Sequence, residues 1–133
     1  MLKKWFGGRP QPLTGAPPVR RHKTYSAQSG YVYQYHFEGH RSNRRDGQAT
    51  EYVFEFSADR RTFSRVSVFL EDDAVRAWER AHARALAPNE QYAIAKMALF
   101  QAFDERESPS LMHHPVRVRA ADAEAILATL GLD

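Results

Sequence analysis

The sequence contains no cysteine, which excludes disulfides, thiolate nucleophiles and cysteine-ligated metal centres. It also contains no apolar run near the roughly 20 residues that a membrane-spanning helix needs. Lys3 and Lys4 precede Trp5-Phe6, but Gly7-Gly8 follow at once, so the apolar core of a secretory signal is missing. We therefore expect a cytoplasmic protein with no transmembrane segment.

Several catalytic motifs are also missing from the chain. There is no G-x-S-x-G, no phosphate-binding G-x-x-x-x-G-K-[ST], no G-x-G-x-x-G and no H-E-x-x-H. These absences argue against a classical hydrolase, a nucleotide hydrolase and a zinc protease. The sequence predicts no catalytic residue, no metal ligand set and no cofactor.

The composition is that of a folded domain. Of the 133 residues, 43% are hydrophobic and 12% aromatic, which is typical of a single globular unit. The net charge of +3 is compatible with nucleic acid or anionic lipid but argues for neither.

Residues 1–23 are predicted to form a flexible basic tail, followed by one domain over residues 24–133. The tail carries Pro10, Pro12, Pro17 and Pro18, and all its charged residues are basic. Residues 1–6 mix bulky apolar and cationic side chains, so they are a candidate for a weak contact with a membrane surface or a partner.

Three segments show the period-two alternation of β-strands: residues 31–38, 50–57 and 63–70. Residues 23–29 are a candidate edge strand. We expect an antiparallel meander in which Phe54 lies opposite both Tyr35 and Val66. Its aromatic face is expected to be the core beneath the helices, although open aromatic sheets in other proteins stack single-stranded bases.

Helical patterns follow the strands. Asp72-Asp73 are predicted to cap a helix that ends near Leu86, and residues 88–106 are apolar on nearly every side, which indicates a buried helix. A short strand at 116–119 and a helix at 122–130, closed by Gly131, complete the chain. The predicted fold class is α+β, with a three- to four-stranded antiparallel meander covered on one face by two consecutive helices and a C-terminal helix.

The other sheet face suggests the first functional hypothesis. It carries polar residues, so we expect it to be open to solvent or to a partner. Four apolar side chains interrupt it: Val32, Val53, Phe63 and Phe69. An apolar patch on a polar face is typical of an interface, so the first hypothesis is a non-catalytic interaction module that binds a protein partner or forms a homodimer.

Two further hypotheses stay open. Basic residues near one end of the meander could bind phosphate or nucleic acid: Arg20, Arg21, Lys23, Arg60 and Arg61. Alternatively, His36 could pair with Glu38, Glu51 or Glu55 on the polar face and serve a small enzyme. His82, four residues from Trp78, is expected to be a half-buried histidine with a hydrogen-bond partner.

Overall fold

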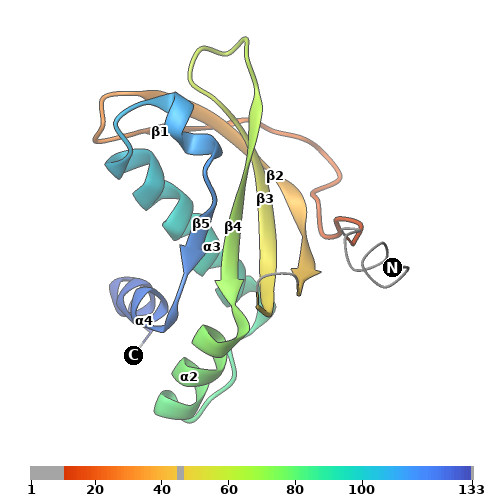
Figure 1. Ribbon diagram of the computed structural model, residues 1–133, viewed down its shortest axis with the longest axis vertical. Helices are drawn as coiled ribbons and strands as arrows, with labels where there is room; N and C mark the ends of the chain where they lie inside the picture. Colours follow the sequence, from red (N-terminus) through yellow and green to blue (C-terminus); the bar gives the residue numbers. More distant parts are fainter. Residues whose placement is uncertain (1–10, 45–46, 133) are drawn as a thin grey trace, which may run out of the picture.

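A computed structural model describes residues 11–44 and 47–132. Within these residues a five-stranded sheet has the order β1-β2-β3-β4-β5, in which the first four strands are antiparallel neighbours and β5 runs parallel to β4 (Figure 1). The strands are β1 (Lys23–Ser26), β2 (Val32–Asn43), β3 (Ala49–Ser57), β4 (Ser64–Glu71) and β5 (Val116–Val118). The α+β class and the antiparallel meander are confirmed, and the parallel fifth strand extends the prediction.

β2 is longer than predicted because it continues through Gly39. The register between β2 and β3 shifts between Phe37 and Gly39, which marks a β-bulge. Gly39 has φ +132, a backbone conformation that favours glycine. The pairing of Phe54 with Val66 is confirmed, but Phe54 lies opposite Phe37 and not Tyr35. The prediction was two residues out of register, which kept every side chain on its face.

In the described part of the chain, three α-helices accompany the sheet: α2 (Asp72–His82), α3 (Pro88–Glu105) and α4 (Ala120–Thr129), with the short 3-10 helix η1 (Pro109–His113) before β5. α3 passes behind the strands in the view of Figure 1. Asp72 and Asp73 lie in the first turn of α2 after the N-cap Glu71, so they complement the helix dipole and do not cap the helix as predicted. Gly131 follows α4 at φ +82, as a terminating glycine should.

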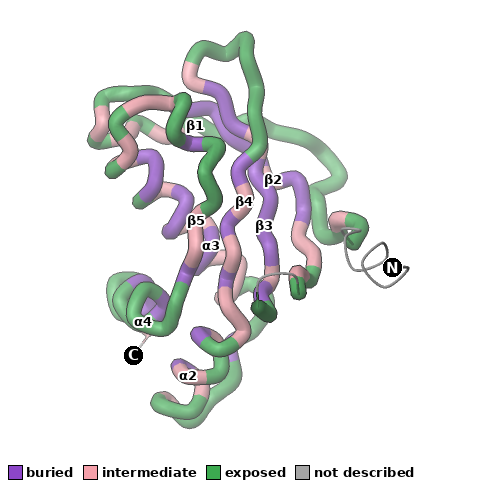
Figure 2. The backbone as a smooth tube through the Cα atoms, viewed as in Figure 1, coloured by how far each residue is buried: buried purple, intermediate pink, exposed green. Residues whose placement is uncertain are grey.

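The core lies between the helices and the sheet face that carries Tyr33, Tyr35, Tyr52, Phe54 and Phe56. Figure 2 shows buried residues along the middle of β2, β3 and β4 and on α3. The buried side chains of α3 include Ile94, Leu99 and Phe103, and Phe103 stacks on Tyr33 with ring centroids 4.1 Å apart. The aromatic face is therefore core, as predicted.

The segment before β1 continues the path of β1 along β2. His22 contacts His36, Arg20 pairs with Glu38, and Thr14 exchanges two backbone hydrogen bonds with His40. We call residues 11–22 the N-terminal arm. It covers part of the β2 edge that β1 leaves free, which protects unpaired strand groups. The predicted contact peptide at residues 1–6 lies outside the described residues.

Among the described helices, none has the length and hydropathy that a membrane span requires.

Candidate functional site

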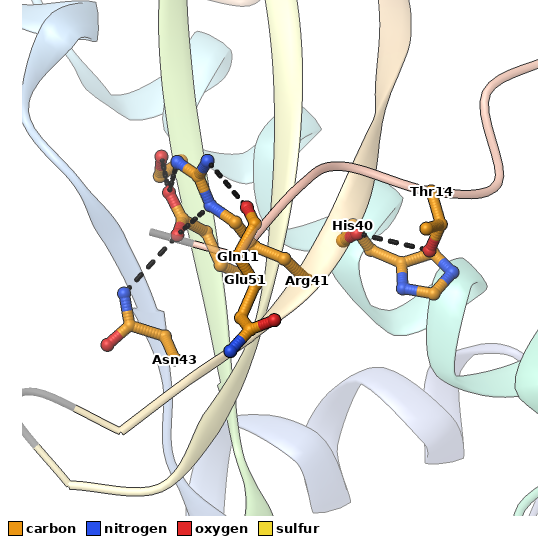
Figure 3. Close-up of polar contacts among 7 residues, drawn as sticks. Gln11, Thr14, His40, Arg41, Asn43 and Glu51 are labelled. Carbon is orange, nitrogen blue, oxygen red and sulfur yellow. Dashed lines mark hydrogen bonds and ion pairs between the residues drawn. The ribbon is translucent and has the colours of Figure 1, made fainter. Parts of the chain in front are cut away.

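The sheet face opposite the helices, called here the outer face, holds a buried carboxylate. Arg41 Nε donates to Glu51 Oε1 at 2.9 Å, and Ser67 Oγ donates to Glu51 Oε2 at 2.5 Å. Asn43 also donates to Glu51, and Arg41 reaches the carbonyl oxygen of Gln11 in the arm (Figure 3). Burial alone would raise the pKa of Glu51, but the hydrogen bonds from Arg41, Ser67 and Asn43 outweigh it, so the pKa is lowered.

A second polar network on the outer face centres on Glu38. Its two oxygens accept from Arg65 at 2.9 Å and from Arg20 at 3.0 Å. His36 Nε2 lies 3.0 Å from Glu38 Oε2 and 3.5 Å from Glu55 Oε1. Desolvation raises the pKa of Glu38, but hydrogen bonds from Arg65 and His36 and the charge of Arg20 reverse that shift and lower it. The predicted pairing of His36 with carboxylates thus involves Glu38 and Glu55, while Glu51 belongs to the other network.

The outer face is less open than the sequence suggested. Five of its polar residues are buried: Gln34, His36, Glu38, Glu51 and Ser57. The prediction that this face is open to solvent or to a partner is wrong for these residues. His36 Nε2 and the carboxylates of Glu38 and Glu51 are satisfied within the two networks, and Ser57 bonds to Asp59 and Arg60 of the following turn.

A cavity of about 600 Å³ lies on the helix side, where the arm meets the sheet and the start of α3. Aromatic rings form much of its wall: Phe37, His40, Tyr52 and Tyr92. Phe37 and Tyr92 have ring centroids 4.9 Å apart, and His40 and Tyr52 are 5.8 Å apart. The remaining wall comes from the arm, the strand ends and the first residues of α3: Gly15, Pro17, Ser42, Thr50, Pro88, Asn89 and Gln91.

His40 reaches this cavity because of the bulge at Gly39. The shift places His40 opposite Tyr52, whose side chain faces the helices. Gly15 of the arm packs against the His40 ring so closely that an added Cβ would lie 2.9 Å from Nε2. Any other residue at position 15 would therefore push the His40 ring out of its observed position.

The cavity carries polar groups that the described part of the chain leaves unused. No hydrogen bond joins the Tyr52 hydroxyl, the Tyr92 hydroxyl or the His40 ring nitrogens to another described residue. Burial raises the pKa of Tyr52 to about 12 and also raises the pKa of Tyr92, so both phenols stay protonated and can donate. At the start of α3, Pro88 has no N–H, and the N–H groups of Glu90 and Gln91 donate to the Ala87 carbonyl oxygen. The Asn89 N–H therefore adds one donor at the positive end of the helix dipole.

The structure places the five residues of the predicted anion site in the arm, at the start of β1 and in the turn after β3. Arg20 is paired with Glu38 on the outer face. Lys23 lies opposite Tyr35, a core residue, and its charge contributes after desolvation to the lowered pKa of Lys96. Arg60 and Arg61 lie in the turn after β3, where Ser57 and Asp59 accept their backbone N–H groups. Within the described residues, this turn and the arm meet through Phe63 and His22, whose ring centroids are 5.0 Å apart, and no interaction joins the two groups of arginines.

The four apolar residues of the predicted interface also differ in their surroundings. Val53 is buried at 2% exposure, whereas Val32 and Phe63 are exposed. The ring of Phe69 lies beneath the guanidinium of Arg117, 5.0 Å from its centroid. They do not form one open apolar patch.

His82 stacks on Trp78 and lies 2.8 Å from Glu124 Oε1, so the prediction of a half-buried histidine with a partner is confirmed.

The cavity between the arm, the sheet and α3 is not among the sites that the sequence predicts. The predicted tail contains the wall residues Gly15 and Pro17, and the strand predicted at residues 31–38 ends before His40. Gly39 inside an alternating run was the available signal, because an isolated glycine in a strand pattern indicates a bulge or a close backbone approach.

In comparisons with known proteins, neither protein-family models, curated protein sequences nor solved structures give a match to the chain.

Proposed function

We propose that this protein is a non-catalytic binding domain for a small, flat aromatic molecule with an acceptor-rich polar edge, held in the cavity between the arm, β2, β3 and α3. The observation that carries the proposal is the meeting of aromatic walls and unused donors in one cavity. A volume of about 600 Å³ is in the range of small-molecule sites, which combine apolar walls with a few placed polar groups.

The aromatic walls favour a flat ligand because ring faces and edges attract other rings at centroid distances of about 4.5–7 Å. The donors favour a carboxylate or carbonyl edge, since the protonated Tyr52 and Tyr92 hydroxyls and the Asn89 N–H at the start of α3 can all donate to oxygen.

The cavity is favoured over the outer face as the binding surface. A partner on the outer face would meet paired charges around Glu38 and Glu51, and desolvating paired charges gives little net affinity. Arg20 already has a carboxylate partner in Glu38, which would compete with a phosphate for that guanidinium.

The proposal is tested by titrating the isotopically labelled protein with benzoate and following its amide signals. We expect saturable shifts at Tyr52, Gln91 and Tyr92, with a dissociation constant on the order of 1 mM for so small a probe. Cyclohexanecarboxylate, which has the same charge but no aromatic ring, should bind more weakly.

Paired variants locate the binding. Tyr92→Phe should weaken benzoate binding about fivefold, the worth of one hydrogen bond, while Tyr31→Phe, which changes a tyrosine outside the cavity wall, should leave it unchanged. Equal binding of the two carboxylates, or equal effects of the two variants, would contradict the proposal.

A further inference from the structure

We propose that His22, His36 and Glu55 form a binding site for a divalent metal ion of the zinc class on the outer face of the sheet. The site is separate from the cavity of the proposed function and does not depend on it. Its three residues come from three segments, since His22 belongs to the arm, His36 to β2 and Glu55 to β3.

The ligand atoms of these residues, one from each, all lie within 4.8 Å of one another. Zinc binds histidine nitrogen and carboxylate oxygen at about 2.0–2.2 Å, so neighbouring ligand atoms of a tetrahedral site are roughly 3.3 Å apart. Binding therefore requires the side chains to close by at most about 1.5 Å. His36 and Glu55 are directly opposite in the β2–β3 register, so the sheet holds these two ligands in place. The exposed His22 side chain would move toward them when the metal ion binds.

The two nitrogens of His36 are in different situations. Nε2 contacts Glu38 Oε2, whose carboxylate also accepts from Arg20 and Arg65. Since arginine only donates, Glu38 acts as the acceptor and Nε2 is assigned as the donor. The lone pair of the neutral ring is then on Nδ1, which is buried without a hydrogen-bond partner in the described residues.

Glu55 faces the other nitrogen, because its Oε1 lies 3.5 Å from His36 Nε2. We therefore assign Nε2 as the metal-binding nitrogen, since 3.5 Å is close to the separation of neighbouring ligand atoms in a tetrahedral zinc site. Zinc binding would release the proton of Nε2 to solvent and replace the hydrogen bond from Nε2 to Glu38.

The rings around His22 position the third ligand. His22 lies with its ring centroid 4.8 Å from that of His36 and 5.0 Å from that of Phe63, on which it stacks. Metal binding would therefore fix the arm to the sheet. Three protein ligands leave a fourth position of a tetrahedral ion for water.

The test uses the full-length protein without an affinity tag, treated with chelator and titrated with Zn²⁺ by calorimetry and with Co²⁺ by visible absorption. We expect one equivalent at micromolar concentration and a raised thermal midpoint with Zn²⁺. Tetrahedral Co²⁺ should give the intense visible bands of that geometry.

Matched variants assign the ligands. His22→Ala alters an exposed residue and should leave the fold intact while weakening Zn²⁺ binding at least tenfold, and Glu55→Gln should do the same. Two controls should bind as the natural sequence does: His82→Ala, which removes a histidine 2.8 Å from Glu124, and the double change His113→Ala/His114→Ala.

Absence of stoichiometric binding at micromolar Zn²⁺ would overturn the proposal. Binding that survives His22→Ala but is lost in the His113→Ala/His114→Ala protein would overturn it as well. Zn²⁺ and Co²⁺ binding are measured without benzoate, and benzoate binding is measured on chelator-treated protein, so the two proposals succeed or fail independently.

Discussion

Glu51 is a buried carboxylate on the outer face of β3, the central strand of the sheet. It stays charged at little cost because Arg41 pairs with it and Ser67 and Asn43 donate to it. A buried charge that loses its partners costs far more than an exposed one. The ionised form of Glu51 should therefore contribute measurably to the stability of the fold.

We predict that Glu51→Gln lowers the free energy of unfolding by about 1–3 kcal/mol at pH 7, the range for a partly buried polar group that loses its charged partner. The substitution keeps the size of the side chain but leaves Arg41 without a counter-charge. Urea denaturation followed by circular dichroism measures the change. Asp73→Asn is the matched control, because the Asp73–Arg76 pair is exposed and such pairs contribute less than about 1 kcal/mol.

The pH dependence of the stability difference between the natural protein and Glu51→Gln tests whether the charge of Glu51 is its source. The pKa of Glu51 is lowered in the folded state from its ordinary value of 4.5. The stabilisation is thus fully present above 4.5 and is lost as the pH falls through the lowered folded value. The difference between natural protein and Glu51→Gln should shrink below pH 4.5; a difference that stays constant down to about pH 3 would show that charge is not its source.

Gly39 determines how the second strand continues past the point where the sequence pattern ends. The alternation in residues 31–38 and 50–57 was enough to predict two strands and their faces, because a period of two is fixed by the strand itself. The alternation alone does not show the bulge; Gly39 is its one signal, and a glycine after a strand pattern also marks a turn. The extension of β2 to Asn43 depends on pairing with β3 and with Thr14, which are tertiary contacts.

We predict that Gly39→Ala destabilises the protein by about 1–3 kcal/mol and loosens the arm. A Cβ at this position would lie 2.8 Å from the carbonyl oxygen of Thr14 and would force φ +132 on alanine. Hydrogen exchange at the Thr14 and His40 amides, which donate to each other's carbonyl oxygens, should become faster. Gly30→Ala is the control, because Gly30 also has a positive φ, +99, but an added Cβ there would have nothing within 4 Å. If Gly30→Ala speeds exchange at the Thr14 and His40 amides as much as Gly39→Ala does, the contact of the added Cβ with Thr14 is not the cause of the faster exchange.

In the candidate sites too, the sequence predicts the positions of strand residues but not those of residues in the arm. His36 could be paired with nearby carboxylates from the sequence, because residues two apart on one strand share a face and neighbouring strands bring Glu55 opposite. His22 and Gly15 could not be placed, since no periodic pattern fixes where a proline-rich segment lies. Their positions follow from the free edge of β2, which is known only once the sheet is assembled.

At the scale of the whole molecule, the arm and the core have separate roles. The buried core begins at Tyr33 and includes no described residue of the arm. The arm instead supplies Gly15 and Pro17 to the cavity wall and His22 to the proposed metal site. The sheet and helices should therefore form the folding unit, and the arm should complete both binding sites.

We predict that a protein lacking residues 1–22 still unfolds cooperatively, with a thermal midpoint lowered by only a few degrees for a loss of about 1 kcal/mol, because the hydrophobic core is intact. It should lose stoichiometric Zn²⁺ binding and bind benzoate several-fold more weakly, since each site loses a part of its wall. A protein lacking only residues 1–10 is the control and should keep both activities, because Gln11, Gly15 and His22 remain. Loss of cooperative unfolding on removal of residues 1–22 would instead make the arm part of the folding unit.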